Sequence, residues 1–318
     1  MTDLHKRSRP QSGPTRPTTL PDLSPITLGT AQFGMPYGDI VKTASLGQKI
    51  CFQILDLAVS RGVHCIDTAA AYGDAEATIG AWLARRPDGK TAPRIVTKLA
   101  ALGDIGAADI RVEVERRIAG SRERLGVPAL DACLVHRPSD LSRPEIIDTL
   151  RRLVDNGVIG AFGVSVYNGA ELETALVTEG VALVQLPHSL FDRRLSNAGL
   201  IAECASRGIT VFARSVFLQG VAFLDPAAVP PKLLEMRPAL ARLNELAART
   251  KLSVASLCLS VALAEPGISS IVIGVASPAE LAINLDEAST SLGPGVLAET
   301  HDIASGLPET VLDPRNWN

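Results

Sequence analysis

Four side chains suited to proton transfer occur at the ends of short apolar runs. Asp67 and Tyr72 follow one such run, Lys98 closes the next, and His136 closes the one after that. If these runs are strands of a parallel α/β barrel, their C-terminal ends open on one face, which carries the chemistry in such folds. An acid, a phenol, an amine and an imidazole would then converge from three successive strands. That combination suits the transfer of a proton to a carbonyl oxygen.

Each of the four residues also has an ordinary structural interpretation. Asp67 could cap a helix, and Tyr72 could be an aromatic residue at a pocket rim. Lys98 could be a solvated strand end, and His136 could be a structural histidine with satisfied hydrogen bonds. All four interpretations would have to hold independently for the site to vanish, so the shared placement favours a site.

Short apolar runs alternate with longer amphipathic stretches from Pro25 onward, which is typical of βα repeats. The predicted strands are 26–31, 63–66, 95–98, 132–136, 160–164, 183–186, 210–213 and 270–273. The predicted helices are 48–59, 76–84, 110–125, 144–156, 169–177, 197–206, 238–250 and 278–288, with an additional helix at 254–264. This count predicts an α/β fold, a single-domain (β/α)8 TIM barrel over residues 25–318. Residues 1–24, rich in proline and polar residues, are predicted to form a flexible N-terminal tail.

The composition excludes several classes of function. Of the 318 residues 46% are hydrophobic, and the formal net charge of -3 gives no electrostatic case for nucleic acid or an anionic membrane. No apolar run approaches the roughly 18 residues of a spanning helix, and the N-terminus lacks the apolar core of a secretory signal. Five scattered cysteines form no Cys-x-x-Cys pair, and Cys65 and Cys133 fall inside predicted strands as buried thiols. We therefore expect a cytoplasmic protein, monomeric or a small homo-oligomer.

Common nucleotide, metal and hydrolase motifs are missing from the sequence. There is no Gly-x-Gly-x-x-Gly after the first strand, no Walker loop and no His-Glu-x-x-His. The stretch Gly163-Val-Ser165 lacks the second glycine of a nucleophile elbow. No metal site is predicted.

Several short motifs share an order and a spacing that extend along nearly the whole chain. They are Leu28-Gly-Thr-Ala-Gln-Phe-Gly34, Ile66-Asp-Thr-Ala-Ala-Ala-Tyr-Gly73 with Glu76 and Gly80 after it, Val96-Thr-Lys98, Leu134-Val-His-Arg137, Gly163-Val-Ser165, Gln185 and Ile273-Gly-Val-Ala-Ser-Pro278. Over about residues 26 to 290 this order resembles the aldo-keto reductases. The resemblance implies a reductase of small aldehydes, ketones or sugars that uses NADP(H) or NAD(H).

The same resemblance implies a role for each of the four polar residues. Tyr72 would be the general acid that protonates the carbonyl oxygen as hydride arrives from the nicotinamide. Lys98 would lower the pKa of Tyr72, Asp67 would keep Lys98 charged and aimed, and His136 would orient the carbonyl.

Cofactor contacts are also implied by the resemblance. The residues concerned are Thr30, Asp67, Ser165, Gln185, Arg214, Ser215, Leu218, Gly220, Gly274, Ser277, Glu280, Leu281 and Asn284. Ser165 and Gln185 would bind the nicotinamide carboxamide, and Ser215 the pyrophosphate. Two positions depart from the family pattern, because Arg214 replaces an aromatic residue that stacks on the nicotinamide, and Gly274 and Glu280 stand where a Lys or Arg usually meets a 2′-phosphate. A carboxylate there would repel that phosphate, which leaves NADH plausible.

The substrate is less well specified. Phe33, Met35, Pro36, Tyr37, Phe191 and Phe217 could form an apolar wall, and Arg137, Arg193 and Arg194 could meet an anionic group. Trp317 could belong to a C-terminal substrate loop or be an exposed tail aromatic. Two alternative functions stay open: a cofactor-binding regulatory barrel that turns over slowly, and an aldolase or lyase that forms a Schiff base through Lys98.

Overall fold

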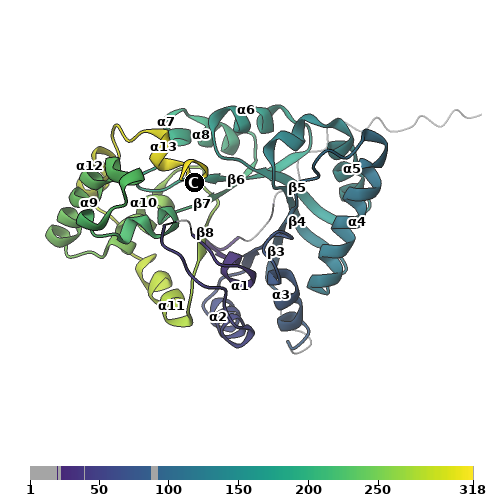
Figure 1. The fold of residues 1–318 in the computed structure, drawn as a ribbon, viewed down its shortest axis with the longest axis horizontal. Helices are drawn as coiled ribbons and strands as arrows, with labels where there is room; N and C mark the ends of the chain where they lie inside the picture. The colour runs from purple at the N-terminus through teal and green to yellow at the C-terminus, as the bar shows by residue number, and fades with distance from the viewer. Residues whose placement is uncertain (1–19, 21–22, 39, 87–91, 318) are drawn as a thin grey trace, which may run out of the picture.

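Eight parallel strands close into a barrel in this computed structural model, which describes residues 20, 23–38, 40–86 and 92–317. Each strand pairs with the next in the sequence, and the last pairs with the first, in the register Leu28 to Ile273 (Figure 1). The strands are β1 (Ile26–Gly29), β2 (Cys65–Asp67), β3 (Arg94–Leu99), β4 (Leu130–Val135), β5 (Ile159–Ser165), β6 (Val181–Pro187), β7 (Thr210–Arg214) and β8 (Ser270–Gly274). The predicted single-domain TIM barrel is confirmed as the fold.

Helices cover the outside of the barrel. They are α1 (Ala31–Gly34), α2 (Gln48–Ser60), α3 (Ala75–Leu83), α4 (Ala107–Leu125), α5 (Pro144–Asp155), α6 (Gly169–Val177), α7 (Arg194–Asn197), α8 (Leu200–Ser206), α9 (Arg237–Thr250), α10 (Val254–Ala264), α11 (Pro278–Glu287), α12 (Pro294–Ile303) and α13 (Glu309–Leu312). Short 3₁₀ turns are η1 (Pro138–Ser142), η2 (Leu218–Phe223), η3 (Pro226–Ala228), η4 (Pro231–Met236) and η5 (Pro314–Asn316). No single helix of the described residues is long and apolar enough to cross a membrane, and only the bent pair 231–250 and 254–264 reaches that length and composition together.

The structure corrects the sequence prediction at three places. Of the predicted helix 197–206, residues 200–206 form α8, while Asn197 ends the separate short helix α7. Gly199, in a left-handed conformation with φ of 74°, lies between the two. The predicted first strand ends at Gly29, because Ala31 already begins α1. Residues after Ala288, for which no element was predicted, form α12, α13 and η5.

The barrel interior is filled by small and apolar side chains that point inward from successive strands. Cys65, Val96, Ala132 and Phe212 belong to this inner cluster, and Leu20 and Leu23 pack against it. These two leucines precede β1, so they lie at the N-terminal end of the barrel. The hydroxyl of Ser24, which donates to the carbonyl of Ile26, anchors the same stretch. The packed part of the chain therefore begins before residue 25, and residues 1–19 of the predicted tail lie outside the described residues.

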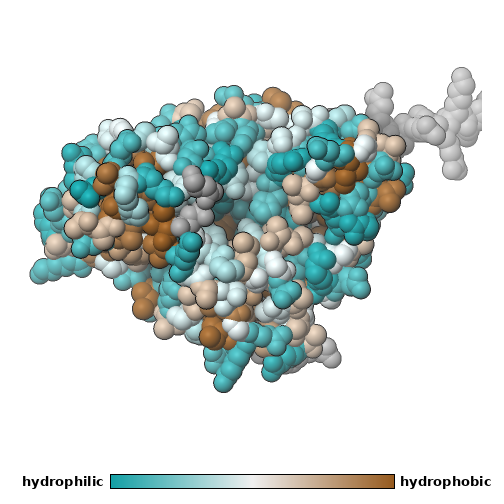
Figure 2. Space-filling view, in the orientation of Figure 1, coloured by the Kyte–Doolittle hydropathy of each residue, from teal (hydrophilic) through white to brown (hydrophobic). Residues whose placement is uncertain are grey.

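All five cysteines are buried free thiols: Cys51, Cys65, Cys133, Cys204 and Cys258. Burial raises the pKa of the Cys65, Cys133 and Cys258 thiols to about 12. The prediction that Cys65 and Cys133 act as buried apolar side chains in strands is confirmed. On the outer surface, the view in Figure 2 shows a depression near the centre of the molecule, with hydrophilic and hydrophobic side chains around it.

Candidate active site

The four polar residues of the sequence prediction lie together at the C-terminal ends of β2, β3 and β4. Asp67 is the last residue of β2, Lys98 is the penultimate residue of β3, and His136 directly follows β4. The ammonium of Lys98 donates to both carboxylate oxygens of Asp67 at 2.7 Å each. It also lies 4.9 Å from the ring centroid of Tyr72, and that ring meets His136 edge-on at 6.0 Å between centroids. The arrangement joins a charged pair, a phenol and an imidazole.

Tyr72 is placed by a close contact between two backbone segments. A Cβ added to Gly34, at the end of α1, would come within 1.9 Å of the Tyr72 carbonyl oxygen. Gly73 has a positive φ of 54°, and a Cβ there would approach the Gly34 carbonyl to 2.2 Å. Only glycine leaves room for this approach, so the two glycines fix where the loop carrying Tyr72 sits.

Burial sets the protonation states of the site. For the phenol, desolvation raises the pKa of Tyr72 above its ordinary value, and the charge of Lys98 lowers it without cancelling that effect. Burial alone would lower the pKa of Lys98, but Asp67 raises it above its ordinary value. Burial, helped by Lys98 and Arg214, lowers the pKa of His136 to about 4. At neutral pH the site therefore holds a protonated phenol, a charged amine and a neutral imidazole, which together can protonate an oxygen atom.

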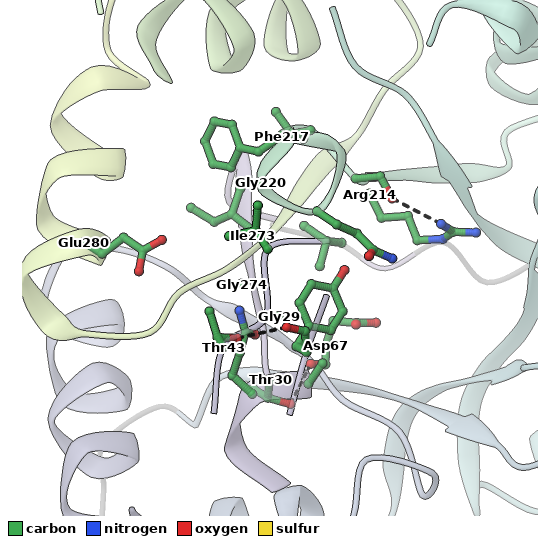
Figure 3. A pocket seen from close by; sticks show the side chains of 18 of the residues that line it. Gly29, Thr30, Thr43, Asp67, Arg214, Phe217, Gly220, Ile273, Gly274 and Glu280 are labelled. Carbon is green, nitrogen blue, oxygen red and sulfur yellow. Dashed lines mark hydrogen bonds between the residues drawn. The ribbon is translucent and has the colours of Figure 1, made fainter. Parts of the chain in front are cut away.

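A cavity of about 310 Å³ extends from Asp67 and Tyr72 toward the start of α11 (Figure 3). The predicted cofactor residues that line it are Thr30, Asp67, Gln185, Arg214, Ser215, Gly220, Gly274 and Glu280. Other predicted cofactor residues, Ser165, Leu218, Ser277, Leu281 and Asn284, are absent from its lining, and all of them except Ser277 are buried. The cavity thus gathers the ends of β1, β2, β6, β7 and β8, which are far apart in the sequence.

Two loops that the sequence did not connect meet over this cavity. The loop before α2 is held by a backbone bridge between Tyr37 and Thr43, and a Cβ added to Gly220 of η2 would come within 3.2 Å of the Val41 side chain of that loop. Near Gly220, Ser215, Leu218 and Gln219 all have positive φ values, although none is glycine. Such strained backbone is typical of ligand clamps. Val41, Thr43 and Gln219 were missed because nothing in the sequence marks their approach to the barrel mouth.

Comparison with known proteins decides the classification. Residues 25–303 match the model of the aldo/keto reductase family. The chain belongs to that family. Membership places it among oxidoreductases.

Three similar proteins share between 19% and 30% of their residues with this chain. Aldo-keto reductase YhdN of Bacillus subtilis is 24% identical over 289 residues, which cover 84% of this chain and 86% of the relative. Aldo-keto reductase str7 of Strobilurus tenacellus is 30% identical over 176 residues, so the match spans about half of either protein, 54% and 51%. The solved holo structure of aldo-keto reductase AKR11C1 from Bacillus halodurans superposes with a TM-score of 0.71 over 92% of this chain and 96% of that one. At 19% identity this likeness supports the fold alone.

Within this aldo-keto reductase, Gln185 contacts the catalytic candidates directly. Its side-chain amide donates to Asp67 at 2.7 Å. The adjacent strand places Ser165 in register with Gln185. The sequence predicted both residues as carboxamide ligands, and the structure adds a bond from one of them to the Asp67–Lys98 pair.

Glu280 closes the opposite end of the cavity. The hydroxyl of Ser277 accepts from the backbone N–H of Glu280 at 3.1 Å, and the Glu280 carboxylate accepts from the N–H of Ala276 at 2.7 Å. This reciprocal pattern is close to a capping box at the start of α11. The Glu280 carboxylate therefore already occupies a backbone N–H group, that of Ala276, to which an added phosphate could otherwise bind.

Several residues proposed for the substrate are already used elsewhere. Arg137 pairs with Asp140, Arg193 with Glu265, and Arg194 with Asp192 and Glu309. Tyr37 and Phe217 line the cavity, whereas Phe33, Met35, Pro36 and Phe191 do not. Trp317 is not an exposed tail aromatic, because its side chain is 1% exposed.

Proposed function

We propose that this chain is an NAD(P)H-dependent reductase that converts the carbonyl of an aldehyde, ketone or sugar to an alcohol. The observation that carries the proposal is the fully buried ammonium of Lys98, held by both oxygens of Asp67 beside the ring of Tyr72. A buried, fixed cation next to a phenol favours the charge that appears on the phenol oxygen when its proton leaves.

Each residue then has one role. Tyr72 donates its phenolic proton to the carbonyl oxygen, and Lys98 stabilises the phenolate left behind. Asp67 keeps Lys98 charged and in place through two hydrogen bonds. His136, neutral at pH 7 because its pKa is lowered to about 4, offers a ring N–H to the same carbonyl oxygen and orients it. The bound nicotinamide cofactor supplies the hydride.

The residues present fit a nicotinamide dinucleotide. Asn284, buried in the second half of α11, has a side-chain N–H₂ group without a hydrogen-bond partner among the described residues. A Cβ added to Gly274 would come within 2.6 Å of the Gln32 amide. Glycine at this position therefore leaves room for Gln32 in the cavity wall. Gln185, Ser215 and Gly274 would hold the cofactor along the wall, and Asn284 would meet its base.

Glu280 makes NADH the better cofactor in this proposal. Its carboxylate lines the cavity and holds the Ala276 N–H. A 2′-phosphate near this group would meet a like charge and lose the anion-binding amide. NADH, which lacks that phosphate, avoids both penalties.

The alternative in which Lys98 forms a Schiff base is less well supported. A nucleophilic amine must be uncharged, whereas Asp67 raises the pKa of Lys98 above its ordinary value. A non-catalytic, cofactor-binding barrel would have the same site geometry as a reductase. Measuring turnover distinguishes the two.

Tyr72→Phe tests the proposal, because it removes the proton donor and keeps the ring. We expect NADH affinity by fluorescence titration to stay within about threefold, and turnover on a panel of aldehydes, ketones and sugars to fall by about a hundred- to ten-thousand-fold. Unchanged turnover would exclude Tyr72 as the acid. If the wild-type protein binds neither NADH nor NADPH, the reductase proposal falls as a whole. Tight binding without turnover on any carbonyl would favour the regulatory alternative.

A further inference from the structure

Arg214, the last residue of β7, lines the cavity at its catalytic end. Its guanidinium carbon lies 4.1 Å from the ring centroid of Tyr167. One terminal nitrogen donates to the Val166 carbonyl at 2.9 Å, and the other to the Ser215 hydroxyl at 3.3 Å. A guanidinium has five N–H donors, so three of them have no protein acceptor among the described residues.

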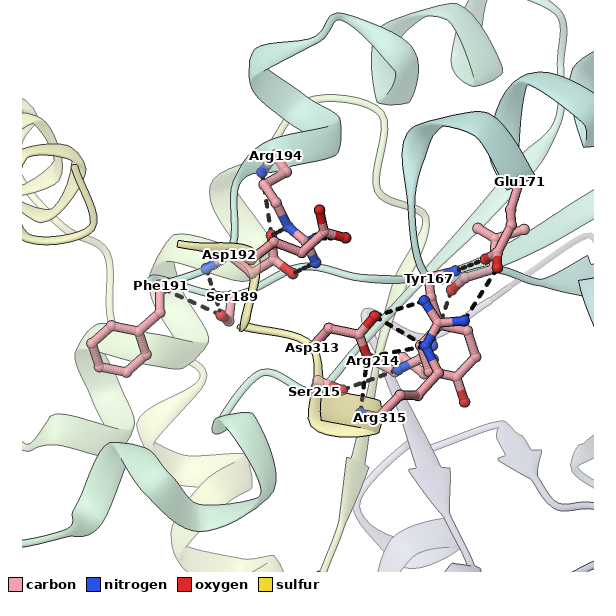
Figure 4. A network of polar contacts seen from close by, with 12 residues as sticks. Tyr167, Glu171, Ser189, Phe191, Asp192, Arg194, Arg214, Ser215, Asp313 and Arg315 are labelled. Atoms are coloured by element: carbon pink, nitrogen blue, oxygen red, sulfur yellow. Dashed lines mark hydrogen bonds and ion pairs between the residues drawn. The ribbon is translucent and has the colours of Figure 1, made fainter. Parts of the chain in front are cut away.

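Arg214 has no acidic partner within ion-pair distance among the residues that the structure describes. The other arginines considered for the cavity mouth, Arg137, Arg193 and Arg194, each have at least one. The nearby acids are Glu171 and Asp313, and both bond to Arg315 (Figure 4). Arg214 therefore carries a charge that no side chain in contact with it offsets.

Tyr167 holds Arg214 in place from one side. The guanidinium carbon of Arg315 lies 3.9 Å from the same ring centroid. Both guanidinium groups therefore stack against the same ring. Glu171 accepts from the Tyr167 backbone N–H at 2.6 Å and completes the frame. Stacked cations of this kind are pre-organised for planar oxyanions.

A negative and a positive side chain lie at opposite ends of the cavity. Figure 3 shows Glu280 and Arg214 at opposite ends of the cavity, with Asp67 on the side of Arg214. Lys98 is neutralised by Asp67, which leaves Arg214 as the excess positive charge at the catalytic end. Its field reaches the reacting groups, because it contributes to lowering the pKa of His136.

We infer that Arg214 is a subsite for an oxyanion and that the substrate carries a carboxylate or phosphate group close to its reactive carbonyl. This inference rests on the proposed reductase function and names its substrate class. A partly buried cation without a counter-ion costs free energy, which an anionic ligand recovers through charge-assisted, two-point hydrogen bonds. The cofactor pyrophosphate is the other possible oxyanion, and the experiment separates the two sources.

The experiment compares carbonyl compounds that carry an anionic group with close analogues that lack the charge. The pairs are phenylglyoxylate with its methyl ester, 4-oxobutanoate with its methyl ester, and glyceraldehyde 3-phosphate with glyceraldehyde. Wild type, Arg214→Met, Arg214→Lys and Arg137→Met are assayed with saturating NADH, and the Kd for NADH is measured for each. Arg137→Met is the matched control, since Arg137 is neutralised by Asp140. Thermal melting reports whether each variant folds.

We expect the wild type to favour at least one anionic member over its neutral partner by about tenfold or more in kcat/KM. Arg214→Met should abolish that preference by raising KM for the anion about tenfold to a hundredfold. The readout is the ratio of kcat/KM for the anion to kcat/KM for its neutral partner, because Arg214 is also a predicted cofactor contact and a loss of NADH affinity would affect both partners alike. Arg214→Lys should retain part of the preference, and Arg137→Met all of it.

Three results would overturn the inference. The first is a failure of the predicted preference: either the wild type favours no anionic compound, or the Arg214→Met variant favours it as strongly as the wild type does. The second is an equal loss of NADH affinity and of activity on both partners in Arg214→Met, which would assign the oxyanion to the cofactor. The third is loss of the preference in Arg137→Met. If no carbonyl is reduced, the reductase proposal falls, and calorimetric binding of benzoate to the wild type but not to Arg214→Met still tests the subsite.

Discussion

At the scale of single residues, the burial of Lys98 and Asp67 explains much of the site. Two ions removed from water are costly unless they pair with good geometry, and the two bonds of 2.7 Å supply that geometry. The sequence predicted which four residues meet, because strand ends of a parallel barrel share a face. It predicted that Lys98 lowers the pKa of Tyr72. Lys98 does lower it, but desolvation is the larger effect and leaves the pKa above its ordinary value. Desolvation depends on neighbours that the local sequence does not reveal.

These protonation states predict a flat pH profile for reduction. The pKa of Tyr72 is raised, so the phenol keeps its proton as the pH rises through neutrality, and the pKa of His136 is about 4, so the imidazole stays neutral well into the acidic range. We expect kcat/KM for an uncharged aldehyde to be constant from about pH 5.5 to about pH 9. A decline with an apparent pKa between about 6.5 and 8 would show that one of these two groups titrates near neutrality.

Glu280 should set the cofactor preference. Glu280→Gln removes the charge and keeps an acceptor for the Ala276 N–H, so the start of α11 should stay intact. We expect wild type to bind NADH more tightly than NADPH, and the variant to narrow that gap by about fivefold in Kd, measured by fluorescence titration. Glu287→Gln, at the other end of α11, is the control and should leave the ratio unchanged. A wild type that prefers NADPH would contradict the assignment.

At the scale of elements, the C-terminal segment supports the loops of the cavity. The residues after α12 form α13 and η5, and Lys232 of η4 donates to the carbonyl of Trp317. Arg315 from the same segment covers Tyr167. The sequence predicted the elements of the barrel from apolar spacing, but this segment has too few residues for a periodic pattern. The break at Gly199 was missed because a single glycine inside a helical pattern is often tolerated.

Trp317 should therefore matter for stability although it is the penultimate residue. Trp317→Ala empties a fully buried site and should lower the free energy of unfolding by about 3 to 5 kcal/mol, measured by urea denaturation. Trp317→Phe should cost clearly less, since the indole N–H has no hydrogen-bond partner among the residues that the structure describes. Val177→Ala, at a side chain that is 79% exposed, serves as the surface control. A loss below about 1 kcal/mol for Trp317→Ala would show that the segment adds little to the fold.

At the scale of the whole molecule, the two ends of the barrel differ: apolar packing closes one end, and the polar candidate site lies at the other. Leu20 and Leu23 pack against the interior at the N-terminal end, whereas Asp67, Lys98 and His136 lie at the opposite end. The βα alternation was enough to predict the barrel, because each strand pairs with the next one in the sequence. The approach of distant segments to one another, such as that of the Val41 loop to Gly220, follows from loop conformations that no local pattern specifies.

The five buried thiols can report local opening of the barrel, because each is shielded from solvent in the folded chain. Cys65 and Cys133 lie in β2 and β4, whereas Cys51, Cys204 and Cys258 lie in α2, α8 and α10. A thiol reacts as the thiolate and only when the reagent reaches it. Each cysteine is therefore labelled only when local opening of its helix or strand exposes it. The labelling rate of each thiol, followed by mass spectrometry, thus measures how often that part of the wild-type chain opens. Adding ligand during labelling would map which parts of the barrel it stiffens, without any engineered probe.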